Sequence, residues 1–285
     1  MRRIAVLNLK GGSSKTTTAL SLAVGMALLQ EKKKPPKRIL LVDADPSANA
    51  SFTILDGRGA PAPTLAHVLL GDAEPSEAIR PTRIPLLNVL PAAGILGTAI
   101  PQLELTMGKE QRLSSALRKV EDDYDACIVD SPPSLSLLTT NVLRAVTDVV
   151  VPCDSSIYSV SGLSRLQETI IEVRKFLDHD PLHIIGMVLT KVVTGNPAAK
   201  TTEKKLRELF GQLVFRTVVP YDPAVENALN SHRSVLEFAP QSEAAKAYNK
   251  LIMEILNHGK QNARPTRPVH GRTEPTQRGK KRRAG

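Results

Sequence analysis

The chain contains few aromatic residues and no tryptophan. Phe and Tyr together make up only 3% of its 285 residues, which disfavours binding of nucleic acid by stacking of bases on aromatic side chains. No apolar run approaches the length needed to span a membrane. The apolar stretch near the N-terminus is also too short for a secretory signal peptide. These absences predict a cytoplasmic protein.

Only two cysteines are present. Cys127 and Cys153 each lie in or beside an apolar, strand-like run, where a reduced and buried thiol is the usual state. Their spacing does not match any arrangement of metal ligands. The sequence therefore predicts neither a disulfide framework nor a cysteine metal site.

Positive charge is concentrated at the C-terminal end. The formal net charge is +10, and residues 260–285 hold nine Lys or Arg side chains and one acid, so the preceding 259 residues carry only +2. Apolar residues nearly vanish in this segment. The composition predicts a folded domain over residues 1–259 and a basic, disordered tail over residues 260–285. Such a tail favours a polyanion, although a merely solubilising segment is the alternative.

Apolar runs and helical patterns alternate through the folded region. Ile4–Asn8 and Arg38–Asp43 are apolar runs on either side of a helical pattern at Thr16–Gln30, which predicts a βαβ unit with parallel strands. The alternation as a whole predicts an α/β fold, a doubly wound, mostly parallel sheet with helices on both faces. Further strands are expected at Leu87–Leu90, Ala126–Val129, Asp148–Pro152, Ile184–Thr190 and Val214–Val219. Further helices are expected at Glu110–Val120, Gly162–Leu177, Thr201–Phe210 and Ser242–Asn257.

The turn between the first strand and its helix reads KGGSSKTTT, from Lys10 to Thr18. Its backbone N–H groups and the helix N-terminus can surround an anion. Lys15 matches the lysine that reaches the β- and γ-phosphates of a nucleotide, and Thr16 matches the hydroxyl that ligates Mg²⁺. Thr17 is placed to bond the α-phosphate. A glycine-rich turn with incidental lysines is the alternative, and the βαβ context argues against it.

One residue of this turn departs from the usual G-x-x-x-x-G-K-[ST] pattern in a way that affects the backbone. Ser14 stands where glycine normally precedes the lysine, and serine is more costly than glycine if φ must be positive there. A turn that keeps φ negative would remove this cost. We expect nucleotide binding to survive the replacement.

The pattern K-G-G-x-x-K-[ST] resembles the deviant Walker A loop of the ParA/MinD group of P-loop ATPases, and Lys10 matches its signature lysine. In that group two ATP-bound subunits close face to face, and this lysine reaches the partner's nucleotide. The resemblance therefore implies ATP and Mg²⁺ as ligands and an ATP-dependent homodimer. On this resemblance the ATP-binding loop comprises Lys10, Gly11, Gly12, Ser13, Ser14, Lys15, Thr16 and Thr17.

Two aspartates extend the resemblance. LLVDADPSANAS, from Leu40 to Ser51, is similar to the group's D-x-D-P-Q-G-N segment, and Asp45 matches the acid that positions the attacking water. YDACIVDSPPSLSLLTTNVL resembles its Walker B and switch region, where Asp130 ends an apolar strand and can hold Mg²⁺ through water. Lys10, Lys15 and Asp45 are thus the implied catalytic residues. Aspartates at strand ends can instead be helix caps.

Two later segments also match. VPCDSSIYSVSGLSRLQETI, from Val151 to Ile170, is similar to the group's V-P…G-L segment, although Asp154 and Ser155 replace the polar residues that usually follow V-P. VFRTVVPYDPAVENA, from Val214 to Ala228, resembles the segment that contacts adenine. This resemblance implies base contacts from Val219, Pro220 and Tyr221, although an apolar strand end would explain these residues equally well.

The group's usual DNA-binding arginines are missing from the loops at 191–200 and 221–232. Other cations could form a substitute surface, although exposed helix lysines are more often only solvated. The candidates in the folded domain are Lys191, Lys200, Lys204, Lys205, Arg216 and Arg233. Those in the tail include Lys280, Lys281, Arg282 and Arg283.

The resemblance implies an ATPase that partitions a plasmid or a chromosome, without indicating which. Its ATP-bound dimer would bind DNA non-specifically at the nucleoid and be released when a ParB-like partner stimulates hydrolysis. Only nine residues precede Lys10, so we expect no N-terminal operator-binding domain. The alternative is a MinD-like membrane-associated positioning ATPase. Because Ser242–Asn257 resembles a helix that packs on the core, we expect no stable membrane anchor. An iron–sulfur ATPase of the same superfamily fits less well, since the cysteines do not match its cluster ligands.

Overall fold

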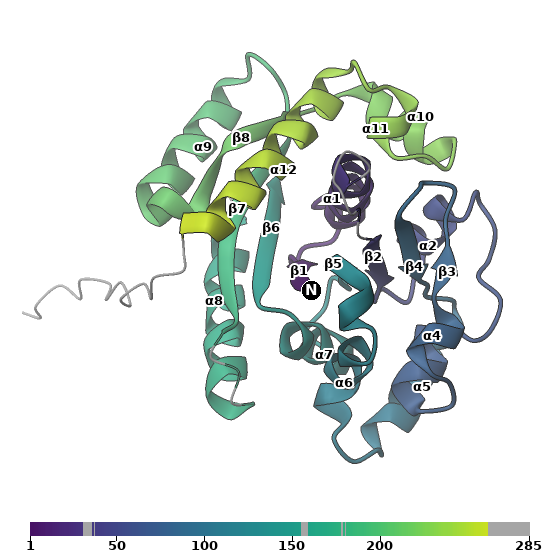
Figure 1. Ribbon diagram of the computed structural model, residues 1–285. Coiled ribbons are helices and arrows are strands. Elements are labelled where there is room, and N and C mark those ends of the chain that lie inside the picture. Colours follow the sequence, from purple (N-terminus) through teal and green to yellow (C-terminus); the bar gives the residue numbers. More distant parts are fainter. Residues whose placement is uncertain (31–35, 37, 155–158, 178, 180, 262–285) are drawn as a thin grey trace, which may run out of the picture.

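The computed structural model describes residues 1–30, 36, 38–154, 159–177, 179 and 181–261. At its centre is an eight-stranded sheet with the order β3-β4-β2-β5-β1-β6-β7-β8 (Figure 1). Neighbouring strands are parallel except for β3 and β4. The strands are β1 (Arg2–Val6), β2 (Arg38–Asp43), β3 (Arg80–Pro81), β4 (Leu87–Leu90), β5 (Tyr124–Asp130), β6 (Asp148–Asp154), β7 (His183–Val192) and β8 (Val214–Pro220).

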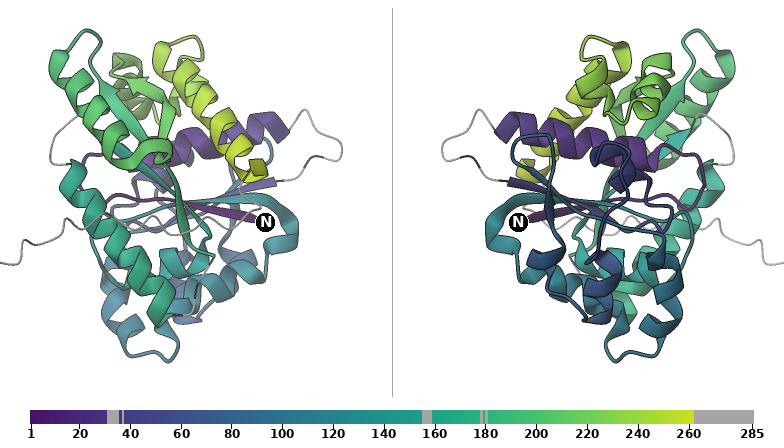
Figure 2. Two further views of the ribbon diagram at one scale, coloured as in Figure 1. Left: turned by 90° about the vertical axis from the view of Figure 1, so that its left-hand side faces the viewer. Right: turned by 90° about the vertical axis from the view of Figure 1, so that its right-hand side faces the viewer.

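Helices cover both faces of the sheet, and the two side views show the same layers (Figure 2). Two separate apolar cores fill the space between the sheet and these layers. One layer contains α1 (Lys15–Gln30), α2 (Asn49–Ile54), α10 (Pro223–Asn230), α11 (Val235–Phe238) and α12 (Glu243–Gln261). The other contains α3 (Leu65–Leu70), α4 (Pro75–Ala78), α5 (Ile95–Glu104), α6 (Arg112–Arg118), α7 (Leu137–Ala145), α8 (Ser159–Phe176) and α9 (Pro197–Phe210). The predicted fold class is therefore confirmed.

The central strands are apolar along most of their length because both of their faces are covered. Ile4, Ala5 and Val6 of β1 are completely buried, as are most residues of β2, β5 and β6. Continuous apolar runs of this kind are typical of parallel strands between two helical layers. The carboxyl ends of these strands meet at one edge of the sheet, where ligands bind in folds of this class.

Helix α12 is part of the core, as the sequence predicts. Leu251, Ile252 and Ile255 are buried, and α12 packs against α1. A side chain at Gly25 of α1 would collide with Ile252, so glycine permits this close approach of the two helices. The Tyr248 hydroxyl lies 3.3 Å from the Thr18 hydroxyl, and burial raises the pKa of Tyr248 to about 12. The apolar face of α12 is therefore occupied within the chain.

The predicted strand boundaries agree with the structure to within two residues, whereas several short helices were not predicted. The expected helix at Glu110–Val120 is split into a 3-10 turn (Lys109–Gln111) and α6. The expected helix at Thr201–Phe210 begins earlier, at Pro197, because the Asn196 side chain caps its N-terminus. Helices α2, α3, α4, α5, α7, α10 and α11 were not expected.

The last described helix ends near the predicted domain boundary. Helix α12 continues to Gln261, two residues past the expected end at residue 259. Residues 262–285 lie outside the described residues, and with them Lys280, Lys281, Arg282 and Arg283. The two cysteines are buried and unbonded, as predicted. Burial raises the pKa of both Cys127 and Cys153 to about 12.

Candidate functional site

The predicted phosphate-binding turn connects β1 to α1 at the carboxyl edge of the sheet. Its backbone takes a left-handed conformation twice, with φ of 72° at Gly12 and 65° at Ser14. The negative φ that would have spared Ser14 any cost is therefore not adopted. Thr18 N donates to the Ser14 carbonyl at 2.9 Å, which is the first hydrogen bond of α1. The left-handed conformation of Ser14 therefore lies where the chain enters the helix.

Lys15 lies buried at the start of α1, 7% exposed. Its Nζ donates to the Lys10 carbonyl at 3.1 Å, which holds the side chain back along the turn. Burial lowers the pKa of Lys15, while the nearby carboxylates of Asp130 and Asp45 act in the opposite direction. A poorly solvated ammonium group gains more from an incoming phosphate than an exposed one, because water screens it less.

The Lys10 side chain contacts a residue of its own chain in this structure. Its Nζ forms an ion pair with the carboxylate of Asp154 at the end of β6. Its backbone N donates to Asn8 Oδ1 at 2.9 Å, and Asn8 Nδ2 donates to the Pro152 carbonyl at 2.7 Å. The turn is thus tied to β6 through both the backbone and the side chain of Lys10.

Asp130 ends β5 directly beside Asp43 of β2. Both are completely buried. Asp43 accepts from Ser51 N and Ser51 Oγ, each at 2.7 Å, and burial raises its pKa to about 6. Neither oxygen of Asp130 accepts a well-formed hydrogen bond, although the Thr16 hydroxyl favours its charged form. Burial and the Asp43 carboxylate raise the pKa of Asp130 well above its usual value.

An unsatisfied, buried carboxylate next to a hydroxyl is a suitable place for a cation. Asp130 and Thr16 offer the oxygen ligands that Mg²⁺ prefers, and Mg²⁺ commonly keeps several waters and shares the phosphates of its nucleotide. The structure therefore fits the predicted metal position. Among the described residues there is no cluster of three or more His, Cys, Asp or Glu side chains that could hold a metal by itself.

Asp45 follows β2 on the loop that leads to α2. Its Oδ1 accepts from Ser47 N at 2.9 Å and from Ser47 Oγ at 2.8 Å, so the carboxylate closes a turn. Asp45 is close enough to Lys15 and Asp130 to influence the pKa of both. The next turn residue, Ala48, is left-handed with φ of 54°. The structure thus brings Asp45 to the predicted site and shows a second role for it as a turn cap.

The residues predicted to contact adenine line a pocket beside the phosphate-binding turn. Val219, Pro220 and Tyr221 share this pocket with Ser14 and Thr17, so the structure brings these two parts of the predicted site together. Sequence reasoning missed several other lining residues, which come from β7, α10 and α12. They include Thr190, Asp222, Val225, Glu226 and Tyr248. Lys191 also lines the pocket, although the sequence suggested it only as a DNA contact.

The candidate DNA-binding cations fall into separate environments. On α9, Lys204 pairs with Glu208 at 3.8 Å, and Arg207 pairs with Glu203 at 2.8 Å. Arg233 forms an ion pair with Asp56. Arg216 is different, because it lines a groove of about 500 Å³ between β8 and α12. Lys200 and Lys205 also lie on α9.

Comparison with known proteins identifies the family of this chain. Residues 1–183 match a family described as an AAA domain. The chain is 34% identical to the sporulation initiation inhibitor protein Soj of Bacillus subtilis over 256 residues, which cover 90% of this chain and 98% of that protein. It is 37% identical to the chromosome-partitioning ATPase Soj of Thermus thermophilus over 258 residues, which cover 90% and 96% of the two chains.

Solved structures show the same fold. A cobyrinic acid a,c-diamide synthase from Mycobacterium smegmatis with bound ADP and magnesium has a TM-score of 0.77 at 29% identity, covering 92% of this chain and 96% of that chain. The cell division ATPase MinD of Pyrococcus furiosus has a TM-score of 0.69 at 25% identity, covering 90% and 98%. The relatives named for chromosome partitioning share more sequence than either structure. This chain belongs to the ParA/Soj family of chromosome-partitioning ATPases.

Proposed function

We propose that this protein is an ATP-driven DNA-partitioning switch. ATP and Mg²⁺ bind at the turn between β1 and α1, two chains close around the nucleotides, and the dimer holds DNA until hydrolysis separates it. The observation that carries this proposal is that buried Lys15 and the buried, unsatisfied carboxyl group of Asp130 lie close enough to influence each other's pKa. Among the described residues, a buried amino group held only by a backbone carbonyl and a buried carboxyl group with no well-formed hydrogen bond match a triphosphate and its metal ion.

Each residue of the site has a distinct task in this proposal. The N–H groups of the turn and Lys15 bind the phosphates, and Thr16 and Asp130 hold Mg²⁺, with water between Asp130 and the ion. The metal neutralises charge that builds up on the phosphates. Asp45 orients the attacking water. Lys10 leaves Asp154 and places its charge against the nucleotide of the partner chain, which stabilises the transferring phosphate.

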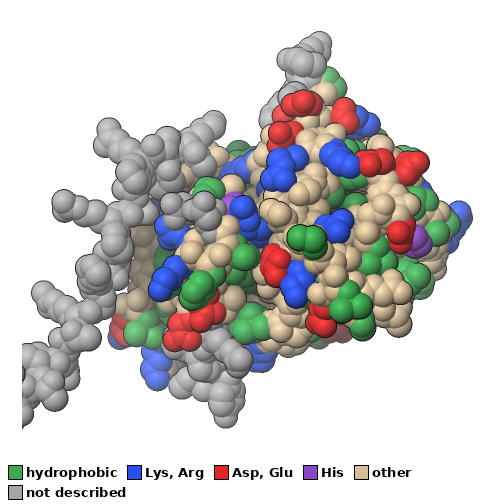
Figure 3. All heavy atoms as spheres, turned by 90° about the horizontal axis from the view of Figure 1, so that it is seen from below, with side chains coloured by type: hydrophobic (Ala, Val, Ile, Leu, Met, Phe, Trp, Pro, Cys, Tyr) green, Lys and Arg blue, Asp and Glu red, His purple; other side chains and the backbone are tan. Residues whose placement is uncertain are grey.

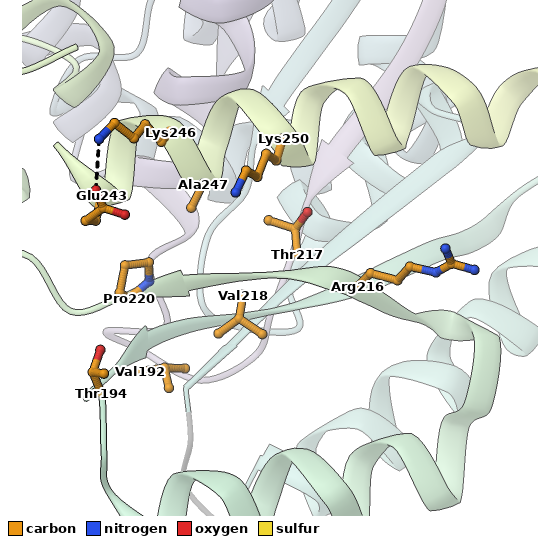
Figure 4. Close-up of a pocket in the computed structure, with 10 residues that line it drawn as sticks. All are labelled: Val192, Thr194, Arg216, Thr217, Val218, Pro220, Glu243, Lys246, Ala247 and Lys250. Atoms are coloured by element: carbon orange, nitrogen blue, oxygen red, sulfur yellow. Dashed lines mark hydrogen bonds and ion pairs between the residues drawn. The ribbon is translucent and has the colours of Figure 1, made fainter. Parts of the chain in front are cut away.

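The proposed DNA contact is the groove between β8 and α12 together with the basic segment that follows α12. Figure 4 shows Lys246 and Lys250 on α12, on one side of this groove, and Arg216 and Pro220 on β8, on the other, with Lys250 pointing toward β8 and Lys246 toward Glu243. Within the described part of the chain, neither Arg216 nor Lys250 has an ion-pair partner, whereas Lys246 pairs with Glu243 at 2.9 Å. Glu254 also lies beside Arg216, where it accepts backbone N–H groups.

Other surfaces suit a polyanion less well. The cations of α9 are partly neutralised by acids one turn away. Seen from below Figure 1, the lower face carries Lys and Arg side chains interspersed with Asp and Glu (Figure 3). The groove holds Arg216, Lys246 and Lys250, and only Lys246 has an ion-pair partner among the described residues. Together with the basic sequence that follows α12, these cations are better suited to follow a phosphate backbone.

The membrane alternative receives less support. No helix in the described part of the chain combines the length and the apolar character needed to cross a bilayer. The apolar side chains of α12 that a membrane-binding helix would need are buried against α1. We therefore favour a nucleoid-associated, cytoplasmic protein whose hydrolysis is slow alone and is stimulated by a ParB-like partner.

The proposal is tested by ATP turnover with and without DNA in the wild type, Lys10→Ala and Lys15→Ala. We expect Lys15→Ala to lose nucleotide binding, and Lys10→Ala to bind ATP without forming the active dimer. Lys119→Ala is a matched control, because Lys119 is an exposed lysine paired with Glu74. Wild-type turnover in both site variants would overturn the assigned roles. Sedimentation with liposomes and ATP separates DNA binding from membrane binding.

The DNA contact is tested by the salt dependence of binding. If about four to six phosphates were neutralised by the tail, removal of residues 260–285 would reduce the logarithmic salt slope by roughly four to five. Lys246→Ala combined with Lys250→Ala would reduce it by about two. Lys204→Ala is the control, since Lys204 lies near Glu208. An unchanged slope in the truncated protein would exclude the tail as a DNA contact. An unchanged slope in the double variant would exclude the groove as a DNA contact.

A further inference from the structure

Lys191 occupies an unusual backbone position next to the phosphate-binding turn. It lies near the end of β7 with φ of 56°, in the left-handed region that is unfavourable for a residue with a Cβ atom. Its Nζ donates to the Gly12 carbonyl at 3.2 Å. A strained residue thus reaches from one strand to the turn that would hold the phosphates.

The strand on both sides of Lys191 is fixed. Thr190 Oγ1 donates to the Cys153 carbonyl at 3.2 Å, and the Val192 carbonyl accepts from Tyr221 N at 2.9 Å. The pairing of β7 with β8 shifts register between Leu189 and Val192, which marks a β-bulge. Bulges next to active sites redirect a side chain, and strained residues persist where their surroundings determine the conformation. The bulge therefore explains why the Lys191 side chain points to the turn.

Lys191 also lines the pocket that contains the proposed base contacts. That pocket includes Ser14, Thr17 and Tyr221, and its volume is about 30 Å³, far below the several hundred Å³ of typical ligand pockets. An adenine base needs more room than this pocket offers, so we expect the lining side chains to move when a nucleotide binds. Lys191 lines this pocket and also contacts Gly12 of the adjoining turn, and Lys191 is exposed, so its side chain can rotate away at little cost.

We propose that Lys191 is a nucleotide-binding residue that closes over the base-proximal half of ATP. On entry of the nucleotide, its ammonium group leaves the Gly12 carbonyl and contacts the α-phosphate or the ribose near Thr17. This inference rests on the proposed nucleotide site and adds a third lysine to it. Because Lys191 lies on the side of the base pocket, it contacts a part of the nucleotide that ATP and ADP share. Its contribution is therefore the same for both nucleotides.

The experiment compares dissociation constants for ATP and for ADP in the wild type, Lys191→Asn and Lys191→Gly. Asparagine and glycine both tolerate the left-handed conformation, so each variant removes the ammonium group without adding backbone strain. We expect both nucleotides to bind about three- to tenfold more weakly in both variants, as for loss of a partly exposed charged contact. KM should rise by more than kcat falls, which is the signature of lost ground-state binding.

A matched control is Lys119→Asn, which removes an exposed lysine that pairs with Glu74 and should leave both dissociation constants unchanged. Unchanged affinities in the two Lys191 variants would overturn the inference while leaving the proposed function intact. Weaker binding of ATP with unchanged binding of ADP would also overturn it, because Lys191 would then act at the γ-phosphate. A wild type that binds neither nucleotide would overturn both proposals.

Discussion

Lys10 and Asp154 form an ion pair within a single chain, between the phosphate-binding turn and the end of β6. The side chains are 38% and 25% exposed, so water screens the pair only in part. If Lys10 acts on the partner chain's nucleotide, it must first leave this carboxylate. Asp154 therefore sets part of the free-energy difference between the single chain and the closed dimer.

Asp154→Asn is expected to promote dimerisation. It removes a charge that favours the single-chain position of Lys10, and a partly exposed ion pair contributes up to about 1 kcal/mol. The ATP concentration at which half the protein is dimeric should fall by up to about fivefold, measured by light scattering with Mg²⁺ present. Asp154→Glu keeps the charge and is the control. An unchanged or higher midpoint in Asp154→Asn would contradict the expectation.

The stability of Ser14 variants should depend on the backbone conformation at this position rather than on the contacts of the side chain. Because φ is 65°, Ser14→Gly should be more stable than the wild type without nucleotide, by up to about 1–2 kcal/mol. Ser14→Val should be less stable than the wild type, because β-branched residues tolerate the left-handed region least. Thermal unfolding of the nucleotide-free protein measures this order. The controls are Ser13→Gly and Ser13→Val, because the structure does not place Ser13 in the left-handed region. Equal melting temperatures for Ser14→Val and the wild type would rule out the left-handed turn.

Glu254 of α12 should stabilise the edge of the sheet. Its two carboxylate oxygens accept from Arg216 N at 2.7 Å and Thr217 N at 3.1 Å, and β8 is the last strand of the sheet. Glu254→Ala leaves two backbone donors without this acceptor, so we expect a loss of about 1–3 kcal/mol in the free energy of unfolding.

Chemical denaturation measures that loss. Glu254→Gln retains one acceptor oxygen and should lose less than Glu254→Ala. Glu208→Ala is the control for loss of a surface carboxylate, because Glu208 forms only a long contact with Lys204. Equal stability of Glu254→Ala and Glu208→Ala would show that the edge strand does not depend on this cap.

His179 should make stability fall in mild acid. Its Nε2 donates to the Val146 carbonyl at 2.6 Å and its Nδ1 accepts from Arg144 at 2.9 Å, an arrangement that requires a neutral ring. Burial lowers the pKa of His179, and Arg144 and Arg3 add to this effect. The unfolded chain therefore binds more protons than the folded chain just below pH 6.5, the usual pKa of histidine.

The contribution of His179 is fully present above pH 6.5 and is lost as the pH falls through the lowered pKa of the folded state. His179→Gln removes this titration. Denaturation of both proteins at several pH values between about 5 and 7.5 should show a steeper decline for the wild type. Parallel declines would mean that another group is responsible.

The sheet was predictable because parallel strands between two helical layers are continuous apolar runs, as in Arg38–Asp43. The short helices were not, since each has too few residues for a clear helical period. Helix α5 even contains Pro101, a residue that normally argues against a helix interior. These helices form because the chain packs them against the sheet, and such tertiary packing leaves little trace in local sequence.

The functional site likewise combines residues that local sequence signals predict with contacts that they do not predict. Lys15, Thr16 and Asp130 were identified by a motif and a strand end, which are local signals. The ion pair of Lys10 with Asp154 joins residues 144 positions apart, and the contact of Lys191 with Gly12 spans 179. No local sequence pattern predicts contacts between residues so far apart along the chain. The conformation of Ser14 was also not predictable, because nothing in the sequence indicates that serine adopts the backbone normally left to glycine.

The burial of both thiols has a practical consequence. With the pKa of Cys127 and of Cys153 near 12 and no other cysteine in the chain, neither sulfur is a competent nucleophile in the native protein at neutral pH. A cysteine introduced on the surface would accept a maleimide dye alone, without removal of the native pair. Conversely, alkylation of the native pair would report the rate at which the sheet opens.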